Sequence, residues 1–177
     1  MHTAVSSFAQ VGLYVVAALS LVVWLTMSRP EKVALAVQVV IGLVAVAVLV
    51  KLAGAIHDDP RPFVVDPSLH PWFSHPADNG FPSDHTAVGC VTAFLVLFHR
   101  RLAGLGVLAL AILVGVARVI AHVHHVEDIV AGILIGLVAA ACGVVCWLAV
   151  RRTTWAERAA GTRGARETAS PGRTGRP

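Results

Sequence analysis

Ionisable side chains gather at a few places in an otherwise apolar sequence, and their spacing indicates chemistry on an anion. His124 and Asp128 are four residues apart, so on a helix one would lie above the other. A carboxylate bonded to one imidazole nitrogen fixes the tautomer and leaves the other nitrogen free to attack. Arg118 brings a planar fork of N–H donors that matches phosphate oxygens. The three residues therefore predict a nucleophilic phosphate site, although Arg118 alone could equally extend its charge to a membrane interface.

A second polar patch is the stretch 81–85, which reads Phe-Pro-Ser-Asp-His. Ser83 is a favoured N-cap residue, and Asp84 would occupy the first turn of the helix that follows. The free backbone N–H groups of such a turn, aided by the helix dipole, bind anions. His85 lies on the same turn and could meet the bound group. Taken alone, the pattern is also that of an ordinary helix cap.

The rest of the sequence supplies helices that can position these groups in a membrane. The 177 residues are 56% hydrophobic and 14% charged, with a mean hydropathy of +0.76, whereas soluble domains carry about a quarter charged residues. About 20 apolar residues cross the hydrocarbon core. Apolar runs predict five helices, over 9–27, 33–50 with an extension to about 56, 83–98, 102–117 and 129–150. We therefore expect an all-α, polytopic membrane helix bundle in a single domain, 1–150.

Charges in the connections orient this bundle, because cytoplasmic loops collect Lys and Arg. Basic residues follow the first, third and fifth helices, namely Arg29, Lys32, Arg100, Arg101 and the tail 151–177 with its seven Arg and two Glu. The C-terminus is therefore expected in the cytoplasm, and the long connection 57–82 on the other face. From about Thr153 the tail has too few large apolar residues to build a core, so we expect disorder. Its position after a membrane segment favours anionic lipid headgroups, not nucleic acid, as the partner.

Taken together, the polar motifs resemble those of the PAP2 phosphatase superfamily, which shares its site with vanadium haloperoxidases. The family motifs read Lys-x6-Arg-Pro, Pro-Ser-Gly-His and Ser-Arg-x5-His-x3-Asp. Their counterparts here, in the same order, are Arg61-Pro62, the stretch 82–85, and Arg118 with His124 and Asp128. The sequence departs from the pattern in three ways: Lys51 is separated from Arg61 by nine residues, with Gly54 in the family's lysine position, Asp84 replaces Gly, and Ala117 replaces Ser.

The resemblance implies an integral-membrane lipid phosphatase, and the residues around the first two motifs are similar to the undecaprenyl-diphosphate phosphatase branch linked to bacitracin resistance. It implies hydrolysis of undecaprenyl diphosphate to undecaprenyl phosphate, a lipid carrier of cell-wall synthesis, at the extracytoplasmic face of a bacterial cell membrane. His124 would form a phosphohistidine, Asp128 would hold its ring, and His85 would act as acid and base. The phosphate-binding residues would be Arg61, Arg118, Ser83, Asp84 and Lys51. The implied chemistry needs no metal or other cofactor.

Two alternatives stay open, because the motif residues would contact only the phosphate. The substrate could be phosphatidic acid or phosphatidylglycerol phosphate, or the protein could bind or transport a lipid phosphate without catalysis. Binding alone would need only the arginines, so the two motif histidines favour an enzyme. The sequence leaves the lipid tail and the oligomeric state open.

The other loop histidines could suggest a metal site. They are His57, His70, His75, His122 and His125, and Asp58, Asp59 and Glu127 lie near them in the sequence. They show no recognised zinc-ligand signature. We therefore expect them to form hydrogen bonds, and we expect no metal site.

Overall fold

The computed structural model describes residues 2–168, and their side chains as far as Thr153. Six helices follow one another: α1 (His2–Leu25), α2 (Arg29–Ile56), α3 (Pro62–Val65), α4 (Asp84–His99), α5 (Arg101–Ile120) and α6 (Val126–Thr168). The described residues contain no strand, only an isolated antiparallel bridge between Pro60 and Asn79. The expected all-α bundle is confirmed.

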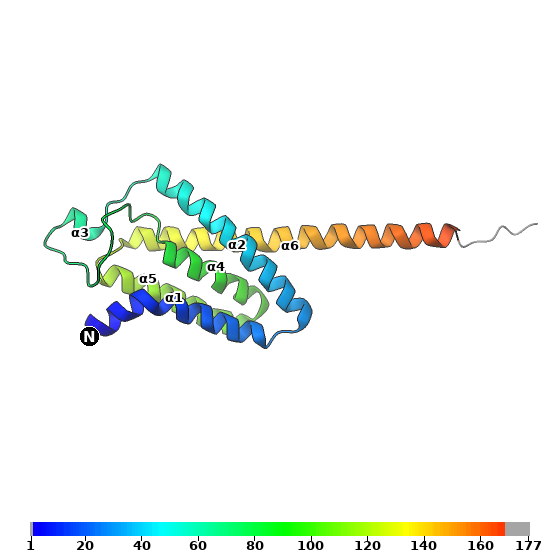
Figure 1. Cartoon of the computed structure of the whole chain (residues 1–177), viewed down its shortest axis with the longest axis horizontal. Helices are drawn as coiled ribbons and strands as arrows, with labels where there is room; N and C mark the ends of the chain where they lie inside the picture. Colours follow the sequence, from blue (N-terminus) through cyan, green and yellow to red (C-terminus); the bar gives the residue numbers. More distant parts are fainter. Residues whose placement is uncertain (1, 169–177) are drawn as a thin grey trace, which may run out of the picture.

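Four of these helices are long and apolar enough to cross a membrane: α1, α2, α5 and the Val126–Thr153 part of α6. The fifth, α4, has only 16 residues, and eight of them are buried. It contacts α1, α2, α5 and α6, so the longer helices surround it (Figure 1). Because neighbouring helices cover it, α4 can be shorter than the hydrocarbon thickness and begin below the surface of the bundle.

Small residues on α6 let α4 approach it closely. A Cβ atom on Gly136 would lie 2.7 Å from Cys90 Cβ, and one on Gly132 would lie 2.8 Å from the Ser83 carbonyl oxygen. Glycines four residues apart form one face of a helix, and in membranes such faces pack backbone against backbone. This packing fixes the first turn of α4 against the start of α6.

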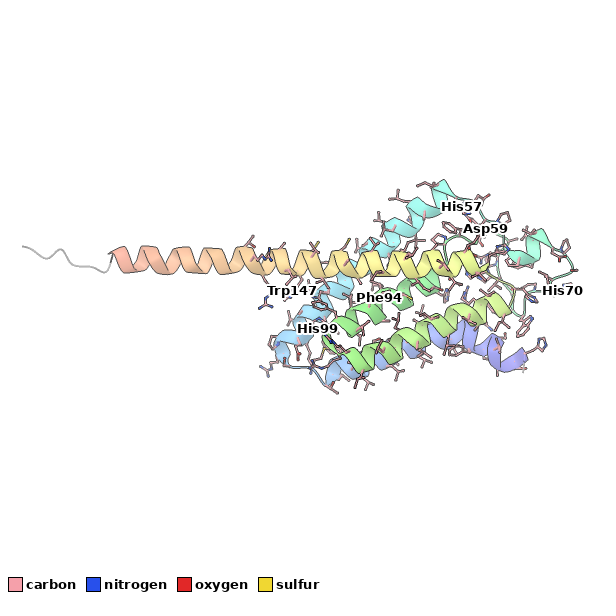
Figure 2. The ribbon with its side chains drawn as sticks, turned by 180° about the vertical axis from the view of Figure 1, so that it is seen from behind. His57, Asp59, His70, Phe94, His99 and Trp147 are labelled. Atoms are coloured by element: carbon pink, nitrogen blue, oxygen red, sulfur yellow. The ribbon has the colours of Figure 1, made fainter. Side chains whose placement is uncertain are left out.

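The connections divide between the two ends of the bundle (Figure 1). The loop 57–83, which contains α3, and the turn 121–125 lie at one end, called here the site end. The connections 26–28 and Arg100 lie at the opposite end, where Arg100 donates two hydrogen bonds to Glu31, 2.8 and 2.9 Å long. Figure 2 shows His57, Asp59 and His70 at the site end and His99 nearer the opposite end.

Two helices extend furthest beyond the ranges that the sequence predicted. Helix α1 begins at His2, because its first residues contact the loop: His2 stacks on Trp72, and the Ser6 hydroxyl donates to the Trp72 carbonyl oxygen. Helix α6 continues to Thr168, whereas we expected disorder from about Thr153. Ala, Arg and Glu are strong helix formers, and an existing helix extends without a new nucleation cost. The tail residues 169–177 lie outside the described residues.

Candidate active site

The centre of the site is the pair His124 and Asp128. His124 Nδ1 lies 3.0 Å from Asp128 Oδ2, and both side chains are buried. The expected helical stacking of the pair is wrong in detail, since His124 lies in the turn before α6 and Asp128 lies in the first turn of that helix. In this turn His122 has a left-handed backbone conformation, with φ of 60°, which reverses the direction of the chain. The same Asp128 oxygen accepts the His125 backbone N–H at 2.8 Å.

This environment leaves one nitrogen of His124 ready to react. Burial lowers the pKa of His124 below its ordinary value, and the hydrogen bond to Asp128 offsets only part of that effect. The ring is therefore neutral at neutral pH. Because the carboxylate can only accept, Nδ1 carries the proton, and Nε2 keeps a free lone pair.

The first turn of α4 supplies backbone donors beside this pair. The Ser83 hydroxyl caps the helix by accepting from the Thr86 amide and the Thr86 hydroxyl, at 3.4 and 3.0 Å, and the Ser83 amide donates to the Asp128 carbonyl oxygen. The amides of Asp84 and His85 have no hydrogen-bond partner within the described residues. Free amides at the start of a helix are suited to binding an anion. In both bonds with Thr86 the Ser83 oxygen acts as an acceptor, so its own O–H can still donate, and the expected contact of this hydroxyl with phosphate stays a prediction.

Arg61 enters the site from the start of α3 and is buried. Its Nε donates to Asp78 Oδ1 at 2.8 Å, and its Nη1 donates to the Val123 carbonyl oxygen at 2.7 Å. Burial by itself raises the pKa of Asp78, but the hydrogen bond and charge of Arg61 outweigh it, and the net pKa lies below the ordinary value. These two contacts fix the guanidinium beside the turn that carries His124.

Arg118 enters from the last turn of α5 and is also buried. Its Nη1 donates to the Ala9 carbonyl oxygen at 3.2 Å, and its Nη2 lies 3.0 Å from His75 Nε2. Its Nε has no partner within the described residues. Burial and, next, the charge of Arg61 lower the pKa of His75. A neutral His75 can accept from Arg118, so this loop histidine orients the arginine while the Nε–H of Arg118 stays free to donate.

These groups surround one cavity of about 440 Å³ at the site end. Its lining consists of Val50, Gly54, Arg61, His75, Asp78, Asn79, Gly80, Phe81, Pro82, Asp84, His85, Arg118 and His124. A larger cavity of about 770 Å³ lies at the opposite end and is lined by residues such as Gln38, His99 and Trp147. Among the described residues that line it, there is no hydrogen-bonded carboxylate–histidine pair and no second buried arginine site, so the smaller cavity is the candidate active site.

The structure thus brings together five of the expected site residues on the cavity wall: His124, His85, Arg61, Arg118 and Asp84. Asp128 and Ser83 lie directly behind that wall through their hydrogen bonds. Lys51 does not line the cavity, and its side chain is exposed. On α2 the cavity is lined by Val50 and Gly54, and Lys51 is turned about 100° from Val50.

Three polar loop residues in the lining were not predicted as site residues: His75, Asp78 and Asn79. Asn79 organises the loop, because its side chain accepts from the amides of Asp59 and Phe81 and donates to the carbonyl oxygens of Gly54 and His57. The signal available in the sequence was the concentration of polar residues in the long connection 57–82. That signal marked the loop but could not say which of its residues turn inward.

The chain is similar to curated membrane proteins. It is 33% identical over 141 residues to "Bacitracin transport permease protein BcrC" of Bacillus licheniformis, covering 79% of this chain and 68% of that protein. It is 29% identical over 121 residues to "Undecaprenyl-diphosphatase BcrC" of Bacillus subtilis (strain 168), covering 67% of this chain and 60% of that protein. It is also 29% identical over 137 residues to "Putative undecaprenyl-diphosphatase YbjG" of Escherichia coli (strain K12), covering 77% and 68%.

The family pattern of the PAP2 superfamily matches residues 33–155, which contain every lining residue of the cavity. That match covers more than half of the 177 residues. The apolar helices and the membrane-associated relatives make this a multi-pass membrane protein. The expected family is confirmed: the chain belongs to the PAP2 superfamily, the group of phosphatases whose three motifs meet in this cavity.

Proposed function

We propose that this protein hydrolyses undecaprenyl diphosphate to undecaprenyl phosphate through a phosphohistidine intermediate on His124. The observation that carries the proposal is the His124–Asp128 pair, which adjoins the cavity that two buried arginines and His85 also line. A neutral imidazole held by a carboxylate is a nucleophile. The arginines and the first amides of α4 supply donors for phosphoryl oxygens.

In the first step, His124 Nε2 bonds to the terminal phosphorus, and the bond from that phosphorus to the bridging oxygen breaks. His85 donates a proton to the departing oxygen of undecaprenyl phosphate. In the second step, His85 takes a proton from water, the water oxygen attacks the phosphohistidine, and the phosphorus–nitrogen bond breaks to release inorganic phosphate. Arg61, Arg118 and the amides of the α4 first turn stabilise the negative charge in both steps. No step passes through a metal ion.

The substrate assignment is supported by the names of two relatives, each described as an undecaprenyl-diphosphatase. The orientation follows from charge: Arg29, Lys32, Arg100 and Arg101 lie at the end opposite the cavity, where cytoplasmic loops collect basic residues. We therefore place the active site on the extracytoplasmic face and the C-terminus in the cytoplasm.

The test is phosphate release by the detergent-purified protein in the presence of EDTA. Undecaprenyl diphosphate and phosphatidic acid are compared for the parent protein, for His124→Ala and for His70→Ala, which changes an exposed histidine of the loop 57–83. We expect release from the polyprenyl substrate by the parent and by His70→Ala, and its loss in His124→Ala. Activity on phosphatidic acid alone would overturn the substrate. A protein that binds both lipids and hydrolyses neither would support the binding or transport alternative.

A further inference from the structure

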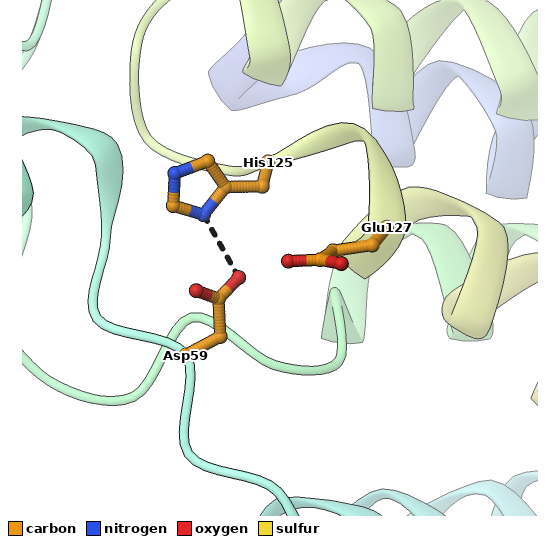
Figure 3. A group of neighbouring side chains, drawn as sticks. All are labelled: Asp59, His125 and Glu127. Atoms are coloured by element: carbon orange, nitrogen blue, oxygen red, sulfur yellow. Dashed lines mark hydrogen bonds and ion pairs between the residues drawn. The ribbon is translucent and has the colours of Figure 1, made fainter.

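Three metal-ligating side chains converge beside the active site without belonging to it (Figure 3). They are Asp59 from the loop before α3, His125 from the turn before α6, and Glu127 from the first turn of α6. Each offers one ligand atom, and these atoms all lie within 4.8 Å of one another. His125 Nδ1 lies 2.8 Å from Asp59 Oδ2.

The negative charge of this cluster is poorly balanced. The Glu127 carboxylate faces that of Asp59 (Figure 3) and has no ion-pair or hydrogen-bond partner within the described residues. A third carboxylate, Asp128, adjoins the cluster through the His125 backbone N–H. Its Oδ1 is buried and has no hydrogen-bond partner in the described part of the chain. His125 can offer only one side-chain proton to the two carboxylates of Asp59 and Glu127, so a cation of higher charge would be held favourably.

We propose that Asp59, His125 and Glu127 form a binding site for a divalent transition metal ion, with Zn²⁺ as the best-fitting ion. One imidazole nitrogen and two carboxylate oxygens suit zinc, whereas Mg²⁺ and Ca²⁺ prefer oxygen ligands alone. Zinc bonds of about 2.0–2.2 Å place tetrahedral ligands roughly 3.3 Å apart. Asp59 and His125 already lie near that spacing. A rotation of the exposed Glu127 side chain would bring its carboxylate to that spacing, and water would take the fourth position.

The ion would join two segments that carry catalytic residues. Asp59 precedes Arg61 by two residues, and His125 directly follows His124. The Asp59 backbone is itself fixed, because its carbonyl oxygen accepts from the Gly80 amide at 2.9 Å. The cluster residues do not line the catalytic cavity. Its ion would therefore stabilise the arrangement of the site without touching the phosphoryl group, and the proposal stands whether or not the proposed substrate is correct.

The test is zinc titration of the full-length, detergent-purified protein, with its affinity tag removed and its metals stripped by EDTA before buffer exchange. Binding is followed by calorimetry and by the shift of the melting temperature, with Mg²⁺ as the comparison ion. The variant is Glu127→Gln, which removes a ligand from an exposed side chain without disturbing a contact. Its matched control is Asp58→Asn, which removes the same charge from an exposed residue beside Asp59.

We expect one zinc ion to bind and to raise the melting temperature, with little effect of Mg²⁺. Glu127→Gln should weaken zinc binding by at least about tenfold, while Asp58→Asn should match the parent protein. Both variants should melt like the parent when metal-free, so an effect on zinc binding cannot be ascribed to misfolding. No saturable zinc binding, or equal binding by Glu127→Gln and the parent, would overturn the proposal and leave the Asp59–His125 contact as a simple ion pair.

Discussion

His124 Nδ1 lies 3.0 Å from Asp128 Oδ2, although the two residues belong to different elements. The same oxygen accepts the His125 backbone N–H, and the Asp128 carbonyl oxygen accepts the Ser83 amide. Asp128 thus connects the turn, the start of α6 and the start of α4. Asp128 therefore orients the His124 imidazole and also fixes the positions of these three segments relative to one another.

The substitution Asp128→Asn tests the orienting role. An amide can donate to Nδ1, which would favour the tautomer with its proton on Nε2 and remove the nucleophilic lone pair. In serine proteases the equivalent change lowers kcat by about 10⁴-fold, so we expect a loss of roughly 10³-fold or more in phosphate release. Circular dichroism checks that the helices remain. A variant within tenfold of the parent kcat would contradict this role.

Arg61→Lys tests whether the planar guanidinium is needed in addition to its charge. Arg61 donates to both Asp78 and the Val123 carbonyl oxygen, and an ammonium cannot reproduce that fork. We expect kcat/KM for phosphate release to fall by about 10²-fold, comparable to the loss of one transition-state donor. Asp78→Asn is the comparison. Its side chain is 61% exposed, so its effect should be much smaller, and an equal loss in both variants would assign the effect to the Arg61–Asp78 contact.

His75 should make the stability of the protein depend on pH. Burial and the charges of Arg61 and Arg118 lower the pKa of His75 below its ordinary value of 6.5. The folded state therefore favours the neutral ring. Its contribution to stability is fully present above pH 6.5 and is lost as the pH falls through the lowered pKa. Melting temperatures between pH 7 and pH 5 should fall less steeply for His75→Gln, which keeps an acceptor for Arg118. An unchanged slope would show that His75 does not titrate differently on folding.

The sequence was sufficient to predict the helices and to identify the ionisable residues of the three motifs. In a membrane, long apolar runs satisfy their backbone hydrogen bonds by forming helices. The family spacing of Arg118, His124 and Asp128 can be recognised in the sequence without knowing the conformation of the turn between them. Lys51 was misplaced because its relation to the cavity depends on the rotation of α2. The presence of a lysine near the motif in the sequence does not show which way that lysine points from the helix.

The role of the loop could not be predicted from local patterns. His75 reaches Arg118 across 43 positions, and Asp59 reaches His125 across 66 positions. Such contacts depend on the path of an irregular segment, which hydrophobic periodicity does not specify.

The packing of α6 against α4 should be sensitive to a single methyl group at Gly132. A Cβ there would lie 2.8 Å from the Ser83 carbonyl oxygen and 2.9 Å from Thr86 Cβ. Gly132→Ala should therefore displace the first turn of α4, which carries His85 and the free amides of the proposed phosphate site. We expect a destabilisation of about 1–3 kcal/mol, seen as a lower melting temperature, together with a lower kcat/KM.

Gly106→Ala is the matched control, because a Cβ at Gly106 meets no atom within 4 Å. Since alanine is the better helix former, this variant should melt at the parent temperature or above it and keep full activity. If Gly132→Ala behaved in the same way, the close approach of α4 and α6 would not be what holds the first turn of α4 in position. If it melted normally but lost activity, the turn would be positioned by this contact without the fold depending on it.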